Sequence, residues 1–358
     1  MDFEQIETSI EMKPNEQPGI TVSQPTPAPS FVQIEPVGQC NLACTMCAIP
    51  YRQDGPPYGP PAFMAFELFT RLIDQLPGTK ELHLQGLGEP FMHPRFFEMV
   101  AYASARGMRV TTNTNLTLLN PRRAEDCIRS GLNTLHISID AASAAVYENI
   151  RVKGRFDRVL HNLELLRMTR QRLGGNLPHF KLVAVAMKQN LMELPELVEL
   201  AARYGMEEMF VQHLSHDFSE ESLPAQYMPM RNFVNGQTLL SEDLSKIELF
   251  FGLARERAED LGIKLRLPRP RPRPFDGSTP GRMRCSWPWT GMYISYQGLS
   301  MPCCMVSTPD RINFGNVAEE HGIQKVWNGV EYQQFRDALS STNPPDICKS
   351  CSIYKGIF

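Results

Sequence analysis

The sequence lacks several features that mark large classes of protein. No apolar run approaches the roughly eighteen residues that cross a bilayer, and the N-terminus has no basic and then hydrophobic signal pattern. The net charge is only -3 across 358 residues, which does not favour binding to nucleic acid or to a membrane surface. We therefore expect a cytoplasmic protein with neither kind of partner.

The cysteines do not have the distribution of a secreted disulfide scaffold. The chain is long, and its 42% hydrophobic content can bury a large core, whereas most of its nine cysteines fall into two groups. Such grouping is typical of metal ligands in a reducing compartment. Cys127 stands apart inside a helical pattern, and we expect it to pack in the core.

The first cysteine group, Cys40, Cys44 and Cys47, directly follows the strand-like run Phe31–Pro36. Three thiolates on one short loop can hold three corners of a cubic 4Fe-4S cluster, whose fourth iron then stays open to chelate a small molecule. A zinc knuckle and a disulfide framework are the alternatives. A zinc site would need a fourth Cys or His nearby, and none lies between residues 52 and 81.

A glycine-rich turn, Gly86-Leu-Gly88-Glu89-Pro90, follows a predicted second strand about forty residues later. Cys-x3-Cys-x2-Cys followed by this turn resembles the radical S-adenosylmethionine (radical SAM) superfamily. The resemblance implies that the open iron binds the amino and carboxylate groups of S-adenosylmethionine, and that Gly86, Gly88 and Glu89 help to hold the amino group. Glycines also allow close approach of the backbone to a ligand, and proline stiffens the turn.

The resemblance implies further cofactor contacts at the ends of later strands. Ser138 takes the position of a serine that contacts the ribose, and Asp140 follows it. Arg151 resembles the residue that pairs with the methionine carboxylate, which suits a guanidinium fork, although arginine at a helix end is often a surface or dipole partner. Asn113 and Asn115 occur where the family usually has Thr-Asn-Gly, but here no glycine follows.

The pattern of apolar residues predicts strands alternating with helices. The predicted strands, short and rich in apolar or β-branched residues, are Phe31–Val37, Glu81–Gln85, Arg109–Thr114, Thr134–Asp140, His179–Met187 and Glu208–Leu214. The predicted helices are Phe66–Gln75, Pro94–Ala105, Pro121–Arg129, Phe156–Gln171, Leu194–Arg203 and Leu244–Asp260. Six such units imply an α/β fold, a partial (β/α)6 TIM-like barrel with its chemistry at the C-terminal ends of the strands.

Composition divides the chain into four parts. Residues 1–30, acidic and then rich in Pro, Gln, Thr and Ser, are expected to be a disordered tail. Residues 31–265 form the barrel. Residues 266–284, with a run of alternating Pro and Arg, read as a stiff linker, the alternatives being a docking ligand or an anion patch. Residues 285–358 form a small C-terminal module.

The second cysteine group lies in this module. Cys285, Cys303, Cys348 and Cys351 can close a tetrahedral zinc site or a fully ligated 4Fe-4S cluster, and spacing alone does not decide. Cys304 is adjacent to Cys303, and neighbouring thiolates rarely point at one cluster. A β-hairpin over residues 293–303 and a later helix with a Trp and a Phe are expected here.

The module resembles the shortened SPASM module, often called the twitch module. The resemblance rests on Cys285-Ser-Trp-Pro, Pro302-Cys303, Gly315-Asn-Val, Val326-Trp-Asn and Cys348-x2-Cys351. It implies one auxiliary 4Fe-4S cluster, with Cys303 rather than Cys304 as ligand. The cofactors expected in total are two 4Fe-4S clusters and S-adenosylmethionine.

The resemblance implies an activity. One electron, from a donor such as flavodoxin or ferredoxin, cleaves S-adenosylmethionine to a 5′-deoxyadenosyl radical, which abstracts hydrogen from an unactivated carbon. A fully ligated auxiliary cluster then favours an oxidoreductase that dehydrogenates a small molecule such as a sugar or cyclitol. Modification of a peptide or protein side chain is the alternative, and a non-enzymatic iron-sulfur or zinc module is a third. His213, His216 and Asp217 follow the sixth strand and either face substrate or form a polar loop.

Overall fold

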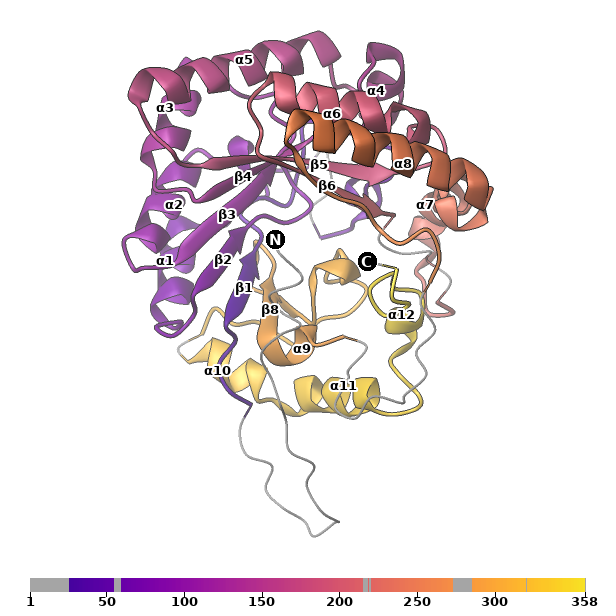
Figure 1. Ribbon diagram of the computed structural model, residues 1–358. Coiled ribbons are helices and arrows are strands. Elements are labelled where there is room, and N and C mark those ends of the chain that lie inside the picture. Colours follow the sequence, from indigo (N-terminus) through magenta and orange to yellow (C-terminus); the bar gives the residue numbers. More distant parts are fainter. Residues whose placement is uncertain are drawn as a thin grey trace.

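The computed structural model describes residues 26–54, 59–214, 218, 220–272, 285–319 and 321–357. Its centre is one nine-stranded sheet with the strand order β7-β6-β5-β4-β3-β2-β1-β8-β9 (Figure 1). Neighbouring strands are parallel except in the β8–β9 hairpin. The predicted fold class, a parallel α/β sheet of the partial-barrel kind followed by a small module, is confirmed.

The elements of the barrel alternate along the chain. Its strands are β1 (Phe31–Ile34), β2 (Glu81–Leu84), β3 (Arg109–Thr114), β4 (Thr134–Ser138), β5 (His179–Ala186), β6 (Glu208–His213) and β7 (Lys264–Arg266). Its helices are α1 (Phe66–Asp74), α2 (Phe96–Ser104), α3 (Pro121–Arg129), α4 (Ala144–Ile150), α5 (Phe156–Leu173), α6 (Leu194–Arg203), α7 (Met228–Gln237) and α8 (Leu244–Leu261). All six predicted strands and six predicted helices are present, and α4, α7 and β7 are additional.

Several helix ends follow from local sequence signals. The side chain of Asn120 accepts a hydrogen bond from Arg123 N and so caps the first turn of α3. Asp243 caps α8 in the same way. Helices α5 and α8 both end at glycines in the left-handed conformation, Gly174 and Gly262, which glycine adopts without steric cost.

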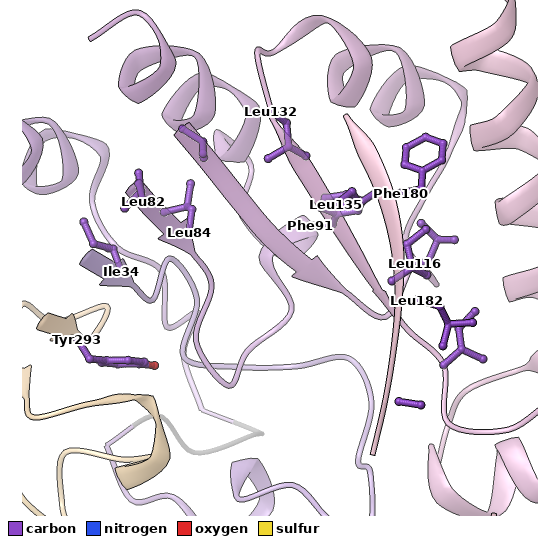
Figure 2. Packing of buried hydrophobic residues seen from close by; sticks show 14 of the residues in the cluster. Ile34, Leu82, Leu84, Phe91, Leu116, Leu132, Leu135, Phe180, Leu182 and Tyr293 are labelled. Carbon is purple, nitrogen blue, oxygen red and sulfur yellow. The ribbon is translucent and has the colours of Figure 1, made fainter. Parts of the chain in front are cut away.

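The two faces of the sheet differ in polarity. Apolar side chains such as Leu82, Leu84 and Leu135 lie on the face that the helices cover (Figure 2). Because side chains alternate along a strand, the intervening residues lie on the inner face. On β1 to β4 these residues include four that are buried and polar, Gln33, His83, Thr111 and His136, whereas on β5 they include Val183 and Val185. The barrel therefore has an apolar outer core and an inner face that is polar on its first four strands.

The C-terminal module extends the barrel sheet. It consists of α9 (Trp287–Thr290), β8 (Gly291–Ile294), β9 (Ser300–Met301), α10 (Gly322–Trp327), α11 (Val330–Ser340) and α12 (Asp346–Lys349). β8 pairs with β1 from Phe31↔Gly291 to Ile34↔Ile294. The predicted hairpin is confirmed, with Gly298 at φ 86° in its turn. The single helix expected to carry Trp327 and Phe335 is instead two helices, because the chain turns at Gly329.

The module also contacts the other end of the sheet. Arg269, beyond β7, donates its backbone N–H to Ile357 O at 3.0 Å. His213, at the end of β6, lies 2.7 Å through Nε2 from Arg269 O. Ser222, after β6, donates to the carboxylate of Asp346 in α12. Figure 1 shows α12 and the C-terminal segment on the side of the barrel opposite β1. The module thus spans the opening between the two ends of the barrel sheet.

The predicted tail and linker fall largely on residues 1–25 and 273–284, outside the described part of the chain. Residues 26–30, expected to be disordered, are held by hydrogen bonds. Trp327 Nε1 donates to Pro27 O at 2.8 Å, and Thr79 Oγ1 donates to Pro29 O at 2.8 Å. None of the described helices combines the length and apolar content needed to cross a bilayer.

A buried ion-pair network lies where the barrel meets the module. Arg52 Nη1 and Nη2 donate to the Glu35 carboxylate at 2.8 and 3.2 Å, and Nη2 donates to Asp54 at 2.7 Å. Tyr296, just beyond β8, donates its hydroxyl to Asp54 O at 2.5 Å. The side chains of Arg52 and Glu35 are 0% and 1% exposed. Removal of Arg52 would leave the Glu35 carboxylate buried without its cation.

Arg52→Met is therefore expected to lower the free energy of unfolding by about 3–5 kcal/mol, because the Glu35 carboxylate loses its cation inside the protein. Urea denaturation followed by far-UV circular dichroism measures the change. The double variant Glu35→Met/Arg52→Met should recover part of the loss. Arg172→Ala, which removes a surface pair with Glu125, is the control and should cost at most about 1 kcal/mol. An Arg52→Met variant as stable as this control would refute the role of the network.

Candidate functional site

The loop with the first three cysteines is fixed by its backbone. It leaves β1 and ends at a 3-10 turn, Ile49–Tyr51. Ala43 N donates to Val152 O and Thr45 N donates to Ile150 O, both at 3.0 Å. These bonds hold the loop against the C-terminal end of α4. Cys40, Cys44 and Cys47 are partly exposed residues. They lie at the C-terminal edge of the sheet, where the chemistry is expected.

The electrostatics of this loop suit a cationic centre. Burial raises the pKa of Cys44 to about 12 and also raises the pKa values of Cys40 and Cys47. The neighbouring Glu89 raises the pKa of Cys40 further, whereas Arg151 lowers those of Cys44 and Cys47. Thiolates are the form that binds iron, and a bound metal supplies the positive charge that deprotonates them. The donor set therefore fits an iron-sulfur cluster held at three corners.

The glycines of the 86–90 turn are required by close packing. A Cβ on Gly88 would lie 2.0 Å from Val37 O and 2.5 Å from Gln39 O, and a Cβ on Gly86 would lie 2.3 Å from Glu35 Cγ. Glu89 N donates to Gln39 O at 3.0 Å. The turn is thus in direct backbone contact with the segment that leads into the cysteine loop.

Glu89 is 3% exposed, and its carboxylate makes its hydrogen bonds within the protein. It accepts hydrogen bonds from Phe91 N at 3.1 Å, Thr114 Oγ1 at 2.7 Å and Asn115 N at 2.8 Å. The bonds from Thr114 and Asn115 tie the turn to the end of β3. The side chain of Glu89 therefore holds the turn in position.

The two asparagines at the end of β3 differ in their contacts. Asn115 Nδ2 lies 3.7 Å from Cys40 Sγ and 3.1 Å from Asn41 Oδ1. Asn113 lies within β3, opposite His136 of β4, and is partly buried. Of the two asparagines named from the sequence, Asn115 is therefore the one that contacts the cysteine loop, from its place one residue beyond the strand.

Asp140 and Arg151 form a buried pair beside the cysteine loop. Asp140 is 0% exposed, and its carboxylate accepts hydrogen bonds from Arg151 Nε and Val185 N, each at 2.7 Å. The pair uses Nε of Arg151, so its two Nη groups stay available to another carboxylate. Asp140 thus orients Arg151 and has no exposed surface for a ligand. Ser138, the last residue of β4, is partly buried at the same edge of the sheet.

The second cysteine group surrounds one cavity in the module. Its lining includes all four predicted ligands, Cys285, Cys303, Cys348 and Cys351, together with apolar residues of α9, η7 (Cys304–Val306), α11 and α12. Cys304 does not line it. Burial raises the pKa of Cys303 to about 12 and raises those of the other three, and neighbouring thiols raise the pKa values of Cys285, Cys303 and Cys348 further. Four such thiols around a largely apolar cavity fit a fully ligated cluster.

The remaining sequence candidates lie elsewhere. Cys127 is fully buried in α3, as predicted. His213 contacts the linker through Arg269 O, so it has a structural partner. His216 and Asp217 lie outside the described residues. Within the described ranges, no three Cys, His, Asp or Glu side chains are grouped as a site for a single metal ion.

Comparisons with known proteins agree with this arrangement. Residues 34–201 match the model of the radical SAM superfamily, and residues 285–352 match SPASM, an iron-sulfur cluster-binding domain. The chain belongs to the radical SAM superfamily. It is a radical SAM enzyme with a C-terminal SPASM domain, so the resemblance seen in the sequence is confirmed.

Curated relatives are similar over most of their length. The AdoMet-dependent heme synthase of Methanosarcina barkeri is 27% identical over 346 residues, 92% of this chain and 91% of the relative. The tungsten-containing aldehyde ferredoxin oxidoreductase cofactor-modifying protein of Pyrococcus furiosus is 25% identical, over 90% and 87%. The mycofactocin maturase MftC of Mycobacterium ulcerans is 27% identical, over 91% and 81%.

Solved structures share the fold. Streptococcus suis SuiB bound to its precursor peptide SuiA has a TM-score of 0.65 at 16% identity, covering 92% of this chain and 71% of that one. anSMEcpe with bound AdoMet has a TM-score of 0.63 at 16% identity, covering 91% and 87%. At such low identity these likenesses describe the architecture alone.

The site makes a prediction about metal content. Anaerobically reconstituted protein is expected to hold about eight irons and eight sulfides, in two 4Fe-4S clusters. Cys303→Ala should lower the iron to about four, whereas its neighbour Cys304→Ala should leave about eight, because only Cys303 lines the cavity. Iron and acid-labile sulfide assays, with zinc measured in parallel, give the numbers. About four irons with zinc in the wild type would contradict the auxiliary cluster.

Proposed function

We propose that this radical SAM enzyme cleaves S-adenosylmethionine reductively at the first cysteine group and dehydrogenates an unactivated carbon of a small molecule. When bound, the first cluster supplies the electron for cleavage and the auxiliary cluster accepts one from the substrate radical. An external donor such as flavodoxin or ferredoxin would provide the starting electron.

The observation that carries the proposal is the pairing of an open cysteine site with an enclosed one on a single sheet. Three thiols follow β1, and the second group lines a cavity next to the hairpin that pairs with β1. A cluster held by four thiolates cannot bind substrate without losing one of them. Its plausible contribution is therefore electron transfer, which makes the net reaction an oxidation.

The residues around the first group support binding of S-adenosylmethionine. The Nη groups of Arg151, held by Asp140, suit the methionine carboxylate. Gly86 and Gly88 allow the turn to pack against the segment that leads into the cysteine loop, and we assign this turn to the amino group. Ser138, Asn113 and Asn115, at or next to the ends of β4 and β3, remain our candidates for the nucleoside, and Asn115 also contacts Cys40.

The interior of the barrel favours a small polar substrate. Its inner face carries Gln33, His83 and Thr111, and His83 Nδ1 is 2.7 Å from Thr111 Oγ1. The module contacts both ends of the barrel sheet, which restricts side entry by a long chain. Two relatives that match over 91% and 87% of their length are named for heme synthesis and for modification of a cofactor. A sugar or cyclitol alcohol is the substrate class that we favour.

Modification of a peptide or protein side chain is the second candidate. A relative of similar length is named a mycofactocin maturase, and this observation favours it. Neighbouring genes would discriminate between the two, because a maturase should lie beside a short precursor-peptide gene and a dehydrogenase beside sugar-pathway genes.

Variants of the two cysteine groups should separate their roles. Cys40→Ala/Cys44→Ala/Cys47→Ala is expected to abolish reductive cleavage of S-adenosylmethionine, because no open iron remains. Cys348→Ala/Cys351→Ala should retain some cleavage and lose product. Chromatographic assay of 5′-deoxyadenosine, with dithionite as reductant, measures cleavage in both variants. Formation of 5′-deoxyadenosine above background by the triple variant would overturn the assignment of the first site.

The product should be two hydrogen atoms lighter than the substrate. One hydrogen atom goes to 5′-deoxyadenosine, and the substrate radical then loses one electron to the protein and one proton to solvent. Mass spectrometry of the product, with substrate labelled by deuterium at the reacting carbon, tests this balance. A product of unchanged mass would indicate an epimerase or mutase and remove the electron-acceptor role, and a heavier one would indicate group transfer.

A further inference from the structure

A buried arginine, Arg311, lies beside the auxiliary cavity. Its side chain is 1% exposed. Nη1 donates to Val306 O at 2.8 Å, in the turn that follows Cys303, and Nη2 pairs with the carboxylate of Glu220. Nε is buried and has no hydrogen-bond partner within the described residues. Such a donor costs free energy unless it meets an acceptor.

Glu220 reaches this arginine from the barrel. It lies beyond β6 and is 4% exposed. Its other oxygen accepts a hydrogen bond from Ser350 Oγ at 2.8 Å, and Ser350 is adjacent to Cys351. The ion pair therefore joins the barrel to both segments that carry Cys303 and Cys351.

Aromatic rings of the barrel enclose the guanidinium. Arg311 Cζ is 5.0 Å from the ring centroid of Phe218 and 6.0 Å from that of Tyr227. The Tyr227 hydroxyl in turn hydrogen-bonds to Thr308 and Asp310 of the module. Water is thus excluded from the charge, and in a medium of low dielectric its field reaches further than it would at the surface.

The charge of Arg311 lies close to the segments that carry two of the four thiols. Nη1 donates to Val306 O, three residues after Cys303, and Glu220, the partner of Arg311, accepts a hydrogen bond from Ser350, next to Cys351. Reduction of a cluster adds one negative charge at the same place. A buried cation beside the cluster stabilises the reduced state and raises the reduction potential, which depends on net charge and on hydrogen bonds to sulfur.

We propose that Arg311 is a positioning residue that raises the reduction potential of the auxiliary cluster, and that Glu220 holds it in place and offsets part of its charge. This inference rests on the proposed function, in which that cluster accepts one electron as the substrate radical loses one proton. Because Glu220 belongs to the barrel, the potential is linked to docking of the module on the barrel.

The test is a redox titration of full-length, reconstituted protein followed by electron paramagnetic resonance. Arg311→Met removes the positive charge and should shift the midpoint potential of the auxiliary cluster to a more negative value. Glu220→Gln keeps the shape and the bond to Ser350, and should shift it to a more positive value. Arg311→Lys should lie between Arg311→Met and the wild type. The potential of the first cluster should stay unchanged in each variant.

The opposite signs separate an electrostatic role from a structural one. If Arg311 and Glu220 only hold the module on the barrel, both variants should shift the auxiliary potential in the same direction or leave it unchanged, and either result overturns the inference. Arg172→Met, a surface substitution, is the matched control and should change nothing. Absence of a second cluster signal in the wild type would instead refute the proposed function itself.

Discussion

The parallel pairing of β1 with β8 is the constraint on which the rest of the structure depends. β1 leads directly into the loop with the first cysteine group, and β8 leads through a tight hairpin to Cys303. A single set of backbone hydrogen bonds therefore fixes one thiol group relative to the other. The buried pair of Arg52 and Glu35, with Tyr296 beside it, continues the junction beyond the strands. Loss of this junction would separate the sites without removing any cysteine.

Two buried carboxylates hold parts of the first site in position through hydrogen bonds. Glu89 and Asp140 are both nearly inaccessible, and each accepts hydrogen bonds from the protein. Glu89 fixes the glycine turn on β3, and Asp140 fixes the guanidinium of Arg151. Sequence alone grouped these acids with the cofactor contacts. Their hydrogen bonds indicate that they hold the turn and the arginine in position.

The sequence predicted the local structure well and the long-range contacts poorly, for physical reasons. Runs of apolar and β-branched residues predicted the six barrel strands to within a few residues, because burial and alternation are local signals. Helix α4 is only seven residues long, although Ser143 caps it, and α7 contains Pro229 and Gly236, which weaken a helical pattern. The pairing of β1 with β8 joins segments about 260 residues apart, and no local pattern encodes it. The predicted Asn113 lies within its strand, whereas Asn115 turns out to contact Cys40.

Both cysteine groups share one electrostatic arrangement. Each group lies beside a buried arginine that pairs with a carboxylate through only part of its guanidinium. Asp140 accepts a hydrogen bond from Nε of Arg151, and Glu220 accepts one from Nη2 of Arg311. The carboxylate makes burial of the arginine tolerable, because an unpaired charge inside a protein is costly. The remaining N–H groups keep a local positive end that lowers the pKa values of the nearest thiols. The side chain of Arg151 is 9% exposed, whereas that of Arg311 is 1% exposed and lies beside the rings of Phe218 and Tyr227. A buried arginine paired with a carboxylate can therefore bind the carboxylate of a ligand at the first site and raise the reduction potential of the electron acceptor at the second.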